Sequence, residues 1–201
     1  MVSNVNITKT LTGKLLAEKA LVFSSYIKRY ASKLRATMNK GVLTFFCGKM
    51  GAGKSTKAGK ITQEGNSVLL SEDEWLASLY PNKISSLNDY IEYSNILKPQ
   101  IKKLVQSILS AGTNVVMDFP ANTLSQRDWF RSIFSEIEAP HNLIYIDLPN
   151  EACLKQIEKR RTEIPERAAT DTVEMFNQIT KYFMAPTSEE GFNITKVTQN
   201  A

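Results

Sequence analysis

From residue 42 onwards, short apolar runs alternate with segments whose apolar residues recur every three or four positions. Such runs are typical of strands buried on both faces, and such periodic segments of amphipathic helices. We expect strands at 42–47, 67–70, 114–117, 143–148 and 192–197. We expect helices at 53–64, 87–110, 125–138, 150–161 and 171–184, with a loop at 162–170 and with Pro99 as a break or a helix start. This alternation predicts an α/β fold, a three-layer αβα arrangement around a mostly parallel, five-stranded sheet.

Residues 12–37 follow another pattern, that of a basic amphipathic helix, which Gly41 ends. Its apolar positions are Leu15, Leu16, Phe23, Ile27, Tyr30 and Leu34. The sequence therefore predicts an N-terminal helical extension at 1–40 and one domain at 41–201. The apolar face of the extension has three open roles: packing on the domain, a dimer contact, or peripheral binding to an anionic membrane surface.

The charge is concentrated in the extension. Residues 1–40 contain eight Lys or Arg and one Glu, a net charge of +7, whereas the 201-residue chain has a net charge of +5, which leaves −2 for 41–201. A nucleic-acid-binding domain would need a basic groove, so this balance disfavours a long nucleic acid as partner. Two cysteines, no run of 18 apolar residues and no signal-like N-terminus predict a cytoplasmic protein without a disulfide scaffold.

A phosphate-binding loop is the strongest motif in the chain. The segment GKMGAGKS at 48–55 matches G-x-x-x-x-G-K-[S/T] at every fixed position, between an expected strand and an expected helix. Backbone amides of the loop and the helix N-terminus would bind the phosphates of ATP. Lys54 would reach the β- and γ-phosphates, and the Ser55 hydroxyl would ligate Mg²⁺. The expected nucleotide-binding residues are Gly48, Lys49, Met50, Gly51, Ala52, Gly53, Lys54, Ser55 and Thr56.

Two carboxylates follow expected strands that end at the same edge of the sheet. Asp73, after the second strand, is the candidate general base that takes the proton of an acceptor hydroxyl. The alternative is an acid at a helix N-terminus, with Ser71 as the cap and Glu74 completing a capping box. Asp118, after the third strand, is the candidate Mg²⁺ ligand beside Ser55. Its alternative is an Asp that opens a turn before Pro120.

Arginines supply the candidate groups for stabilising phosphoryl charge. Arg127 lies near the start of the helix after the third strand, and three roles are open: pairing with Asp118, holding the acceptor, or simple solvation. Arg160 ends the helix after the fourth strand, and Arg167 follows in a Pro-containing loop. These cations either complement a helix C-terminus or belong to a closing segment over the transferring phosphoryl group.

The strings SEDEWLA at 71–77, DFPANT at 118–123 and EEGFN at 189–193, together with the phosphate loop, resemble a group of bacterial ATP-binding kinases with an AAA-type P-loop domain. More distantly, residues 41–197 resemble the zeta-toxin, chloramphenicol phosphotransferase and polynucleotide 5′-hydroxyl kinase branch. The resemblance implies a P-loop NTPase fold, with Asp73 as the general base and Arg127 and Arg160 as catalytic arginines. Leu76 stands where polynucleotide kinases carry an Arg, which disfavours a nucleic-acid acceptor.

The residues and the resemblance together predict an ATP- and Mg²⁺-dependent kinase that phosphorylates a hydroxyl of a small molecule. Within the enzyme class, a polynucleotide 5′-hydroxyl kinase and a zeta-toxin-like nucleotide-sugar kinase are the alternatives. An interaction module that responds to nucleotide without transferring phosphate is the alternative from another class.

Overall fold

The computed structural model describes residue 19 and the segments 21–30, 40–167 and 170–198. The chain forms two units, Met1–Asn39 and Lys40–Ala201, which are described separately. The strands of the second unit are β1 (Leu43–Cys47), β2 (Ser67–Ser71), β3 (Asn114–Pro120), β4 (His141–Asp147) and β5 (Ile194–Thr198). Its α-helices are α2 (Lys54–Glu64), α3 (Glu72–Leu79), α4 (Leu87–Ser110), α5 (Leu124–Ser135), α6 (Asn150–Glu163) and α7 (Val173–Thr180).

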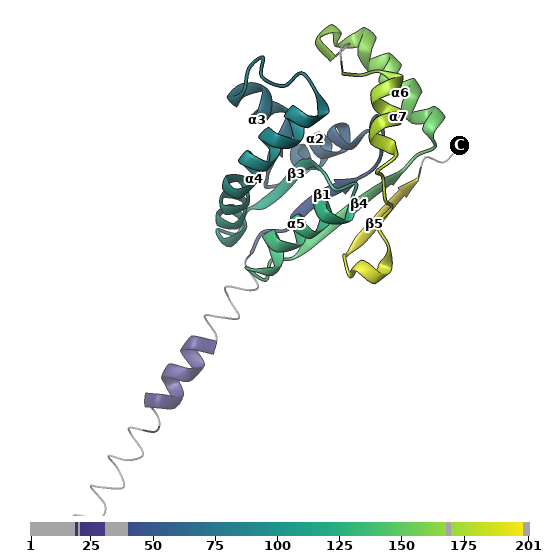
Figure 1. The fold of residues 1–201 in the computed structure, drawn as a ribbon. Helices are drawn as coiled ribbons and strands as arrows, with labels where there is room; N and C mark the ends of the chain where they lie inside the picture. Colours follow the sequence, from purple (N-terminus) through teal and green to yellow (C-terminus); the bar gives the residue numbers. More distant parts are fainter. Residues whose placement is uncertain (1–18, 20, 31–39, 168–169, 199–201) are drawn as a thin grey trace, which may run out of the picture. The chain divides into compact units, whose positions relative to one another are not determined.

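The five strands form one sheet in the order β2-β3-β1-β4-β5. Every neighbouring pair is parallel, so the expected parallel α/β sheet is confirmed. The chain crosses from β1 to β2 on one side and from β3 to β4 on the other, which makes the carboxyl end of β1 a topological switch point. Ligands of open α/β sheets bind at such points. In Figure 1, α3 and α4 lie on the β2 side of this end, and α6 and α7 lie on the β5 side.

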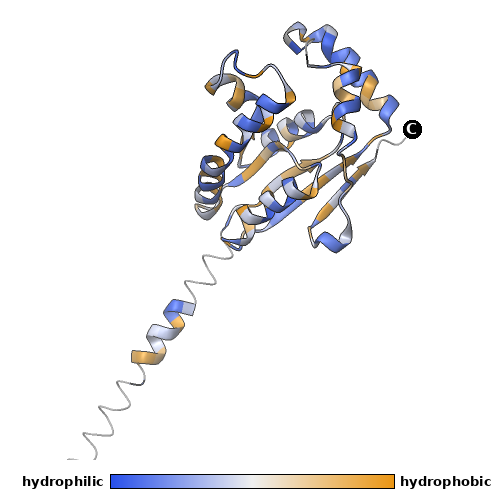
Figure 2. Cartoon of the chain, viewed as in Figure 1, coloured by the Kyte–Doolittle hydropathy of each residue, from blue (hydrophilic) through white to orange (hydrophobic). Residues whose placement is uncertain are grey.

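Both faces of the sheet are buried, because consecutive strand residues point to opposite faces. Phe45 packs with α4 and α5 in one apolar cluster, whereas Phe46 packs with α2, α6 and α7 in another. Hydrophobic residues, coloured orange, accordingly lie along the central strands in Figure 2. Helices on both faces of the sheet give the predicted three αβα layers.

Several element boundaries differ from the expectation. Pro99 neither breaks nor starts a helix, since α4 runs through it from Leu87 to Ser110. Its neighbours Leu97 and Ile101 are buried, so packing holds the helix despite the missing N–H. Residues 162–170 are not all loop, because α6 continues to Glu163 and a 3₁₀ turn follows at Pro165–Arg167. The helix expected at 171–184 is shorter, since α7 begins after its cap Thr172 and ends at Thr180.

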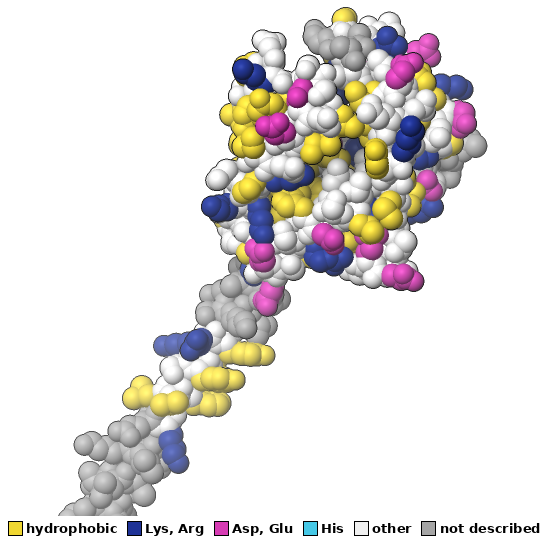
Figure 3. All heavy atoms as spheres, in the orientation of Figure 1, with side chains coloured by type: hydrophobic (Ala, Val, Ile, Leu, Met, Phe, Trp, Pro, Cys, Tyr) yellow, Lys and Arg dark blue, Asp and Glu magenta, His cyan; other side chains and the backbone are white. Residues whose placement is uncertain are grey.

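The first unit contains a helix at 21–30, within the segment 12–37 expected to be helical. The remainder of that segment, residue 19 apart, lies outside the described residues. Large apolar side chains are exposed along this helix: Leu21, Val22, Phe23, Tyr26, Ile27 and Tyr30. Figure 3 shows most of the apolar side chains of this helix on one side and others on the opposite side, with basic side chains between them. No helix in the described part of the chain has both the length and the apolarity of a membrane span.

Candidate functional site

The phosphate loop joins β1 to α2 and has the backbone that its glycines were expected to allow. Gly51 has φ +78° and Gly53 has φ +88°, both in the left-handed region that favours glycine. A Cβ atom on Gly51 would also lie 2.5 Å from the carbonyl oxygen of Cys153, so the loop packs directly on the backbone of α6. Gly53 is the N-cap of α2, and no side chain caps that helix end. The N-terminus of α2 is therefore available to bind an anion.

Lys54 lies across the loop. Its Nζ donates to the carbonyl oxygens of Gly48, at 2.6 Å, and Lys49, at 2.9 Å. Burial lowers the pKa of Lys54 from its ordinary value, and the Asp118 carboxylate opposes that shift. A bound polyphosphate would place negative charge beside this ammonium group and favour its charged form.

Two side chains fasten the loop to its neighbours. The Asn122 side-chain oxygen accepts a hydrogen bond of 2.9 Å from the Gly48 N–H. The Nζ of Lys49 donates to the Asn150 side chain at 2.7 Å, at the start of α6. The Lys49 side chain therefore binds the start of α6, whereas Lys54 binds carbonyl oxygens within the loop. Sequence reasoning missed Asn122 as a support of the loop, although the string DFPANT contains it.

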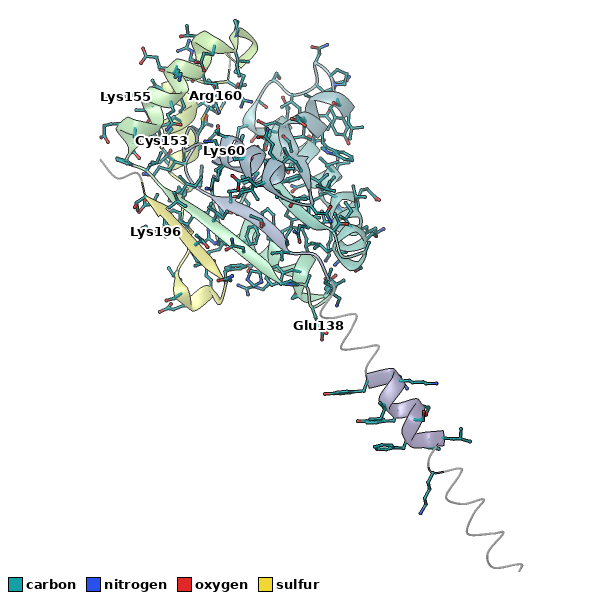
Figure 4. All side chains as sticks on the ribbon, turned by 180° about the vertical axis from the view of Figure 1, so that it is seen from behind. Lys60, Glu138, Cys153, Lys155, Arg160 and Lys196 are labelled. Carbon is teal, nitrogen blue, oxygen red and sulfur yellow. The ribbon has the colours of Figure 1, made fainter. Side chains whose placement is uncertain are left out.

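A cavity of about 500 Å³ opens between the loop and α6. Its volume is within the range of small-molecule sites. It is lined by Gly51, Gly53, Lys54, Ser55, Thr56, Gln156, Lys159, Arg160, Glu163 and Ile164. Figure 4, seen from behind, shows Arg160 and Cys153 on α6. Five expected nucleotide-binding residues and Arg160 therefore share one cavity. Lys159, from the same basic run that ends the helix, also lines it, and Gln156 joins them without a sequence signal.

Asp118 lies beside the loop, on the neighbouring strand. It does not follow β3 but lies within it, opposite Ser71 of β2, where the register of β3 against β1 shifts. Burial raises the pKa of the Asp118 carboxyl, while a hydrogen bond with Ser55 and the charge of Lys54 lower it. The structure thus brings together Ser55, Lys54 and Asp118, as expected for a metal and phosphate site.

Asp73 lies in the first turn of α3, one strand further from the loop. Ser71 is the N-cap of α3, and its side chain accepts a hydrogen bond of 3.4 Å from the Glu74 N–H, so the predicted cap is confirmed. The Glu74 side chain does not return a bond to the Ser71 N–H, so this helix start has no capping box. The Asp73 side chain is exposed, and its charge raises the pKa of Asp118 as a secondary effect after burial. The cap is therefore compatible with the predicted role of Asp73, because it fixes the helix that presents this side chain.

Glu72, next to Asp73, is a buried carboxyl that sequence reasoning did not single out. The Tyr90 hydroxyl donates to it at 2.5 Å, and the Ser94 hydroxyl donates at 2.6 Å. Burial nevertheless raises the pKa of Glu72. Since Tyr90 and Ser94 both belong to α4, Glu72 fixes the start of α3 on α4 and so sets the position of Asp73.

Arg127 is neither paired with Asp118 nor solvated. Its side chain is 1% exposed, and its guanidinium binds Glu190 through Nε at 2.5 Å and Nη2 at 2.9 Å. Nη1 donates to the carbonyl oxygens of Ala121 and Met184. Pairing with Asp118 and simple solvation are therefore wrong. With these partners, Arg127 joins the segment after β3 to the C-terminal region, which favours a structural role over holding the acceptor.

Arg160 and Arg167 meet at one buried acid, Asp171. Arg160 donates to both carboxylate oxygens of Asp171, at 2.5 and 2.7 Å. The Nε of Arg167 lies 3.5 Å from the same carboxylate, and its other guanidinium nitrogens donate to Asp73 at 3.2 and 3.3 Å. Asp171 belongs to no sequence motif. The only sequence feature that could have indicated this ion pair is its position four residues after Arg167.

A family model described as an AAA domain matches residues 43–186, most of the second unit. The chain belongs to this AAA domain family. The expected membership of an AAA-type P-loop family is thereby confirmed. No curated protein matches the sequence.

Among solved structures, this AAA domain protein shares its fold with kinases. A candidate kinase of Chloroflexus aurantiacus matches with a TM-score of 0.63 and 14% identity, over 80% of this chain and 86% of that one. The Mycobacterium tuberculosis APS kinase, in complex with AMPPNP and APS, matches with a TM-score of 0.55 and 18% identity, over 81% and 90%. A sugar kinase of a Janibacter species matches with a TM-score of 0.54 and 14% identity, over 79% and 85%. The chain therefore has the P-loop kinase-like fold that its sequence predicted.

Proposed function

We propose that this AAA domain protein is a kinase that transfers the γ-phosphoryl group of ATP to a hydroxyl of a small molecule. One observation carries the proposal. Three adjacent parallel strands, β2, β3 and β1, deliver Asp73, Asp118 and the phosphate loop to a single edge of the sheet. A phosphate-binding loop beside two separate carboxylates provides both a place for ATP and a group that activates an acceptor.

The residues around the loop suit Mg²⁺ together with ATP. Ser55 and Asp118 offer a hydroxyl and a carboxylate oxygen, the donor types that this hard cation prefers. When bound, Mg²⁺ would neutralise charge on the phosphate oxygens. The uncapped N-terminus of α2 and Lys54 would hold the phosphates, and the cavity against α6 would hold the remainder of the nucleotide.

Asp73 would act on the acceptor. Its carboxylate accepts the proton of the acceptor hydroxyl as that oxygen forms a bond to the γ-phosphorus. The bond from the γ-phosphorus to the oxygen bridging the β- and γ-phosphates breaks, and ADP leaves with that electron pair. Because the transition state is stabilised mainly by positioning and charge, the rigid attachment of α3 to α4 through Glu72 supports catalysis.

A small acceptor suits the charge and surroundings of the site. Residues 41–201 have a net charge of −2, so the domain lacks the basic excess that binds a nucleic-acid backbone. Leu76, which stands where polynucleotide kinases have an Arg, is buried in the core and contributes no cation to the acceptor side. The APS kinase and the sugar kinase that share the fold act, by their names, on small molecules.

The test is a screen with γ-³²P-ATP and Mg²⁺ against three panels: metabolites with free hydroxyls, nucleotide sugars, and RNA oligonucleotides with a 5′-hydroxyl. We expect label transfer to a member of the first panel. Transfer only to nucleotide sugars or only to RNA would replace the proposal with the corresponding alternative. Tight ATP binding without transfer to any panel would instead favour the interaction module, whose binding to its partner would be lost when residues 1–40 are deleted.

A further inference from the structure

Asp171 is a buried carboxylate shared by two arginines. Its side chain is 0% exposed, and α6 and the turn at Pro165–Arg167 each contribute one of the two guanidinium groups. Arg160 forms a bidentate ion pair with Asp171, in which Nε and Nη2 donate to the two carboxylate oxygens at 2.5 and 2.7 Å. The Nε of Arg167 lies 3.5 Å from the same carboxylate. The Asp171 N–H also donates to the Arg167 carbonyl oxygen at 2.8 Å. The acid is thus fixed by both its backbone and its side chain.

The two arginines face different halves of the site. Arg160 lines the cavity with the phosphate loop, and its charge contributes to the lowered pKa of Lys54 after the larger effect of burial. Arg167 contacts Asp73 and acts on Asp118 as well. A single carboxylate therefore lies between a cation on the nucleotide side and a cation on the acceptor side.

We propose that Asp171 is a positioning residue, which holds Arg160 at the nucleotide cavity and Arg167 beside Asp73. This inference rests on the proposed function, because it assigns the two arginines to the two halves of a kinase site. An Arg side chain has many rotamers, and pairing with a rigid carboxylate in planar geometry removes most of them before a ligand binds. The arginines are then pre-organised for the charge of a phosphate.

The sign of one measurement separates this role from simple electrostatics. Asp171→Asn removes a negative charge near the cavity, and by Coulomb's law alone that change would strengthen the binding of anionic ATP. If Asp171 positions Arg160, the same substitution weakens binding, because the guanidinium loses its fixed place. The two explanations therefore predict opposite changes in the dissociation constant.

The experiment is calorimetry of the full chain with Mg-ATP. We expect Asp171→Asn to weaken binding about tenfold, in keeping with the loss of a charge-assisted pair that orients a ligand-binding group. In an Arg160→Gln background the same substitution should change binding less than about twofold, because its effect passes through Arg160. Unchanged or tighter binding in the single variant overturns the inference, and so does an equal loss in both backgrounds.

A chemical readout tests the Arg167 half without any acceptor. Phenylglyoxal modifies accessible arginines, and mass spectrometry gives the rate at each site. Asp171→Asn should raise the rates at Arg160 and Arg167 several-fold, with exposed Arg161 as the internal reference. Glu190→Gln is the matched control, since it disrupts the other buried two-pronged Arg–carboxylate pair. Equal rates in wild type and Asp171→Asn, or the same increase in Glu190→Gln, overturn the inference.

The wild-type measurements distinguish the two proposals. Wild-type binding of Mg-ATP that weakens in Asp171→Asn, without label transfer to any acceptor panel, would uphold the positioning role and overturn the kinase proposal. Phosphate transfer by the wild type, with unchanged ATP binding in Asp171→Asn, would uphold the kinase proposal and overturn the positioning role. No wild-type binding of Mg-ATP would overturn both.

Discussion

The Arg127 guanidinium and the Glu190 carboxylate form a buried pair through two hydrogen bonds, of 2.5 and 2.9 Å. Burial alone would raise the pKa of Glu190, but the hydrogen bonds from Arg127 and the Thr187 N–H, together with the charges of Arg127 and Arg131, lower it below its ordinary value. The pair joins the start of α5 to the 3₁₀ turn at Ser188–Glu190, directly before the segment that leads into β5. An arginine that resembled a catalytic group thus fastens the C-terminal edge of the fold.

Breaking this pair should cost stability and leave nucleotide binding intact. Glu190→Gln leaves the Arg127 charge buried without a countercharge, and such changes destabilise proteins by about 3–5 kcal/mol. Urea denaturation would measure the loss, with exposed Glu189→Gln as the control. Calorimetry of Glu190→Gln below its melting temperature should give the wild-type affinity for Mg-ATP. A large loss of affinity at unchanged stability would restore Arg127 to the site.

Asp73→Asn should strongly reduce transfer while leaving ATP binding nearly unchanged. The amide cannot accept the proton of the acceptor hydroxyl, and loss of a general base reduces turnover by roughly 10²–10⁴. Labelled-ATP transfer assays would measure the decrease, and calorimetry would show nearly unchanged affinity for Mg-ATP. Glu74→Gln is the matched control, since it removes a neighbouring exposed charge from the same first turn of α3. Equal turnover in wild type and Asp73→Asn would remove Asp73 from the mechanism.

Lys54→Ala should impair ATP binding itself. The ammonium group holds the loop through the carbonyl oxygens of Gly48 and Lys49, and the loop motif assigns it to the β- and γ-phosphates. Loss of a charge-assisted contact of this kind should weaken Mg-ATP binding by about tenfold or more. Exposed Lys60→Ala, on the same helix, controls for the change in net charge. Similar affinities in the two variants would contradict the role given to Lys54.

Glu72 should make stability depend on pH in a defined direction. Burial raises its pKa in the folded chain above the ordinary value of 4.5. Between the unfolded and the folded pKa, the folded state therefore binds more protons than the unfolded state. Stability therefore falls as pH rises through this window, by at most about 1.4 kcal/mol per pH unit for one group.

The comparison of wild type with Glu72→Gln isolates this effect, because glutamine does not titrate. Urea denaturation from pH 4.5 to 8 should show the wild type losing stability relative to the variant as pH increases. Tyr90→Phe, which removes one hydroxyl donor from the carboxylate, should enlarge the loss. A difference between wild type and variant that is constant with pH, or that grows in favour of the wild type, would contradict the burial argument.

Much of the fold follows from local pattern. The run around Phe45 and Phe46 is apolar on both faces, and a short run of this kind before a glycine-rich loop is typical of a strand covered by helices on two sides. Boundaries were less predictable where tertiary contacts decide them. The helix through Pro99 persists because its neighbours are buried, and no local rule contains that information.

The site was predictable where a backbone conformation demands particular residues. Gly51 and Gly53 of the phosphate loop have positive φ angles, and Lys54 and Ser55 follow from the same motif. Long-range partners were not predictable in this way. Glu190 lies 63 residues from Arg127, and Arg167 lies 94 residues from Asp73. A sequence without its fold does not indicate which of many charges meet across such separations.

The strand order has a consequence for how such a protein can change. With β1 in the middle, the nucleotide cavity is built from α2 and α6, while Asp73 is presented by α3 on α4. Under the proposed function, substitutions along α3 and α4 can therefore change which acceptor is phosphorylated, while the nucleotide site stays the same. The same fold can in this way serve different acceptors, provided that Arg167 keeps its contacts with Asp73 and Asp171.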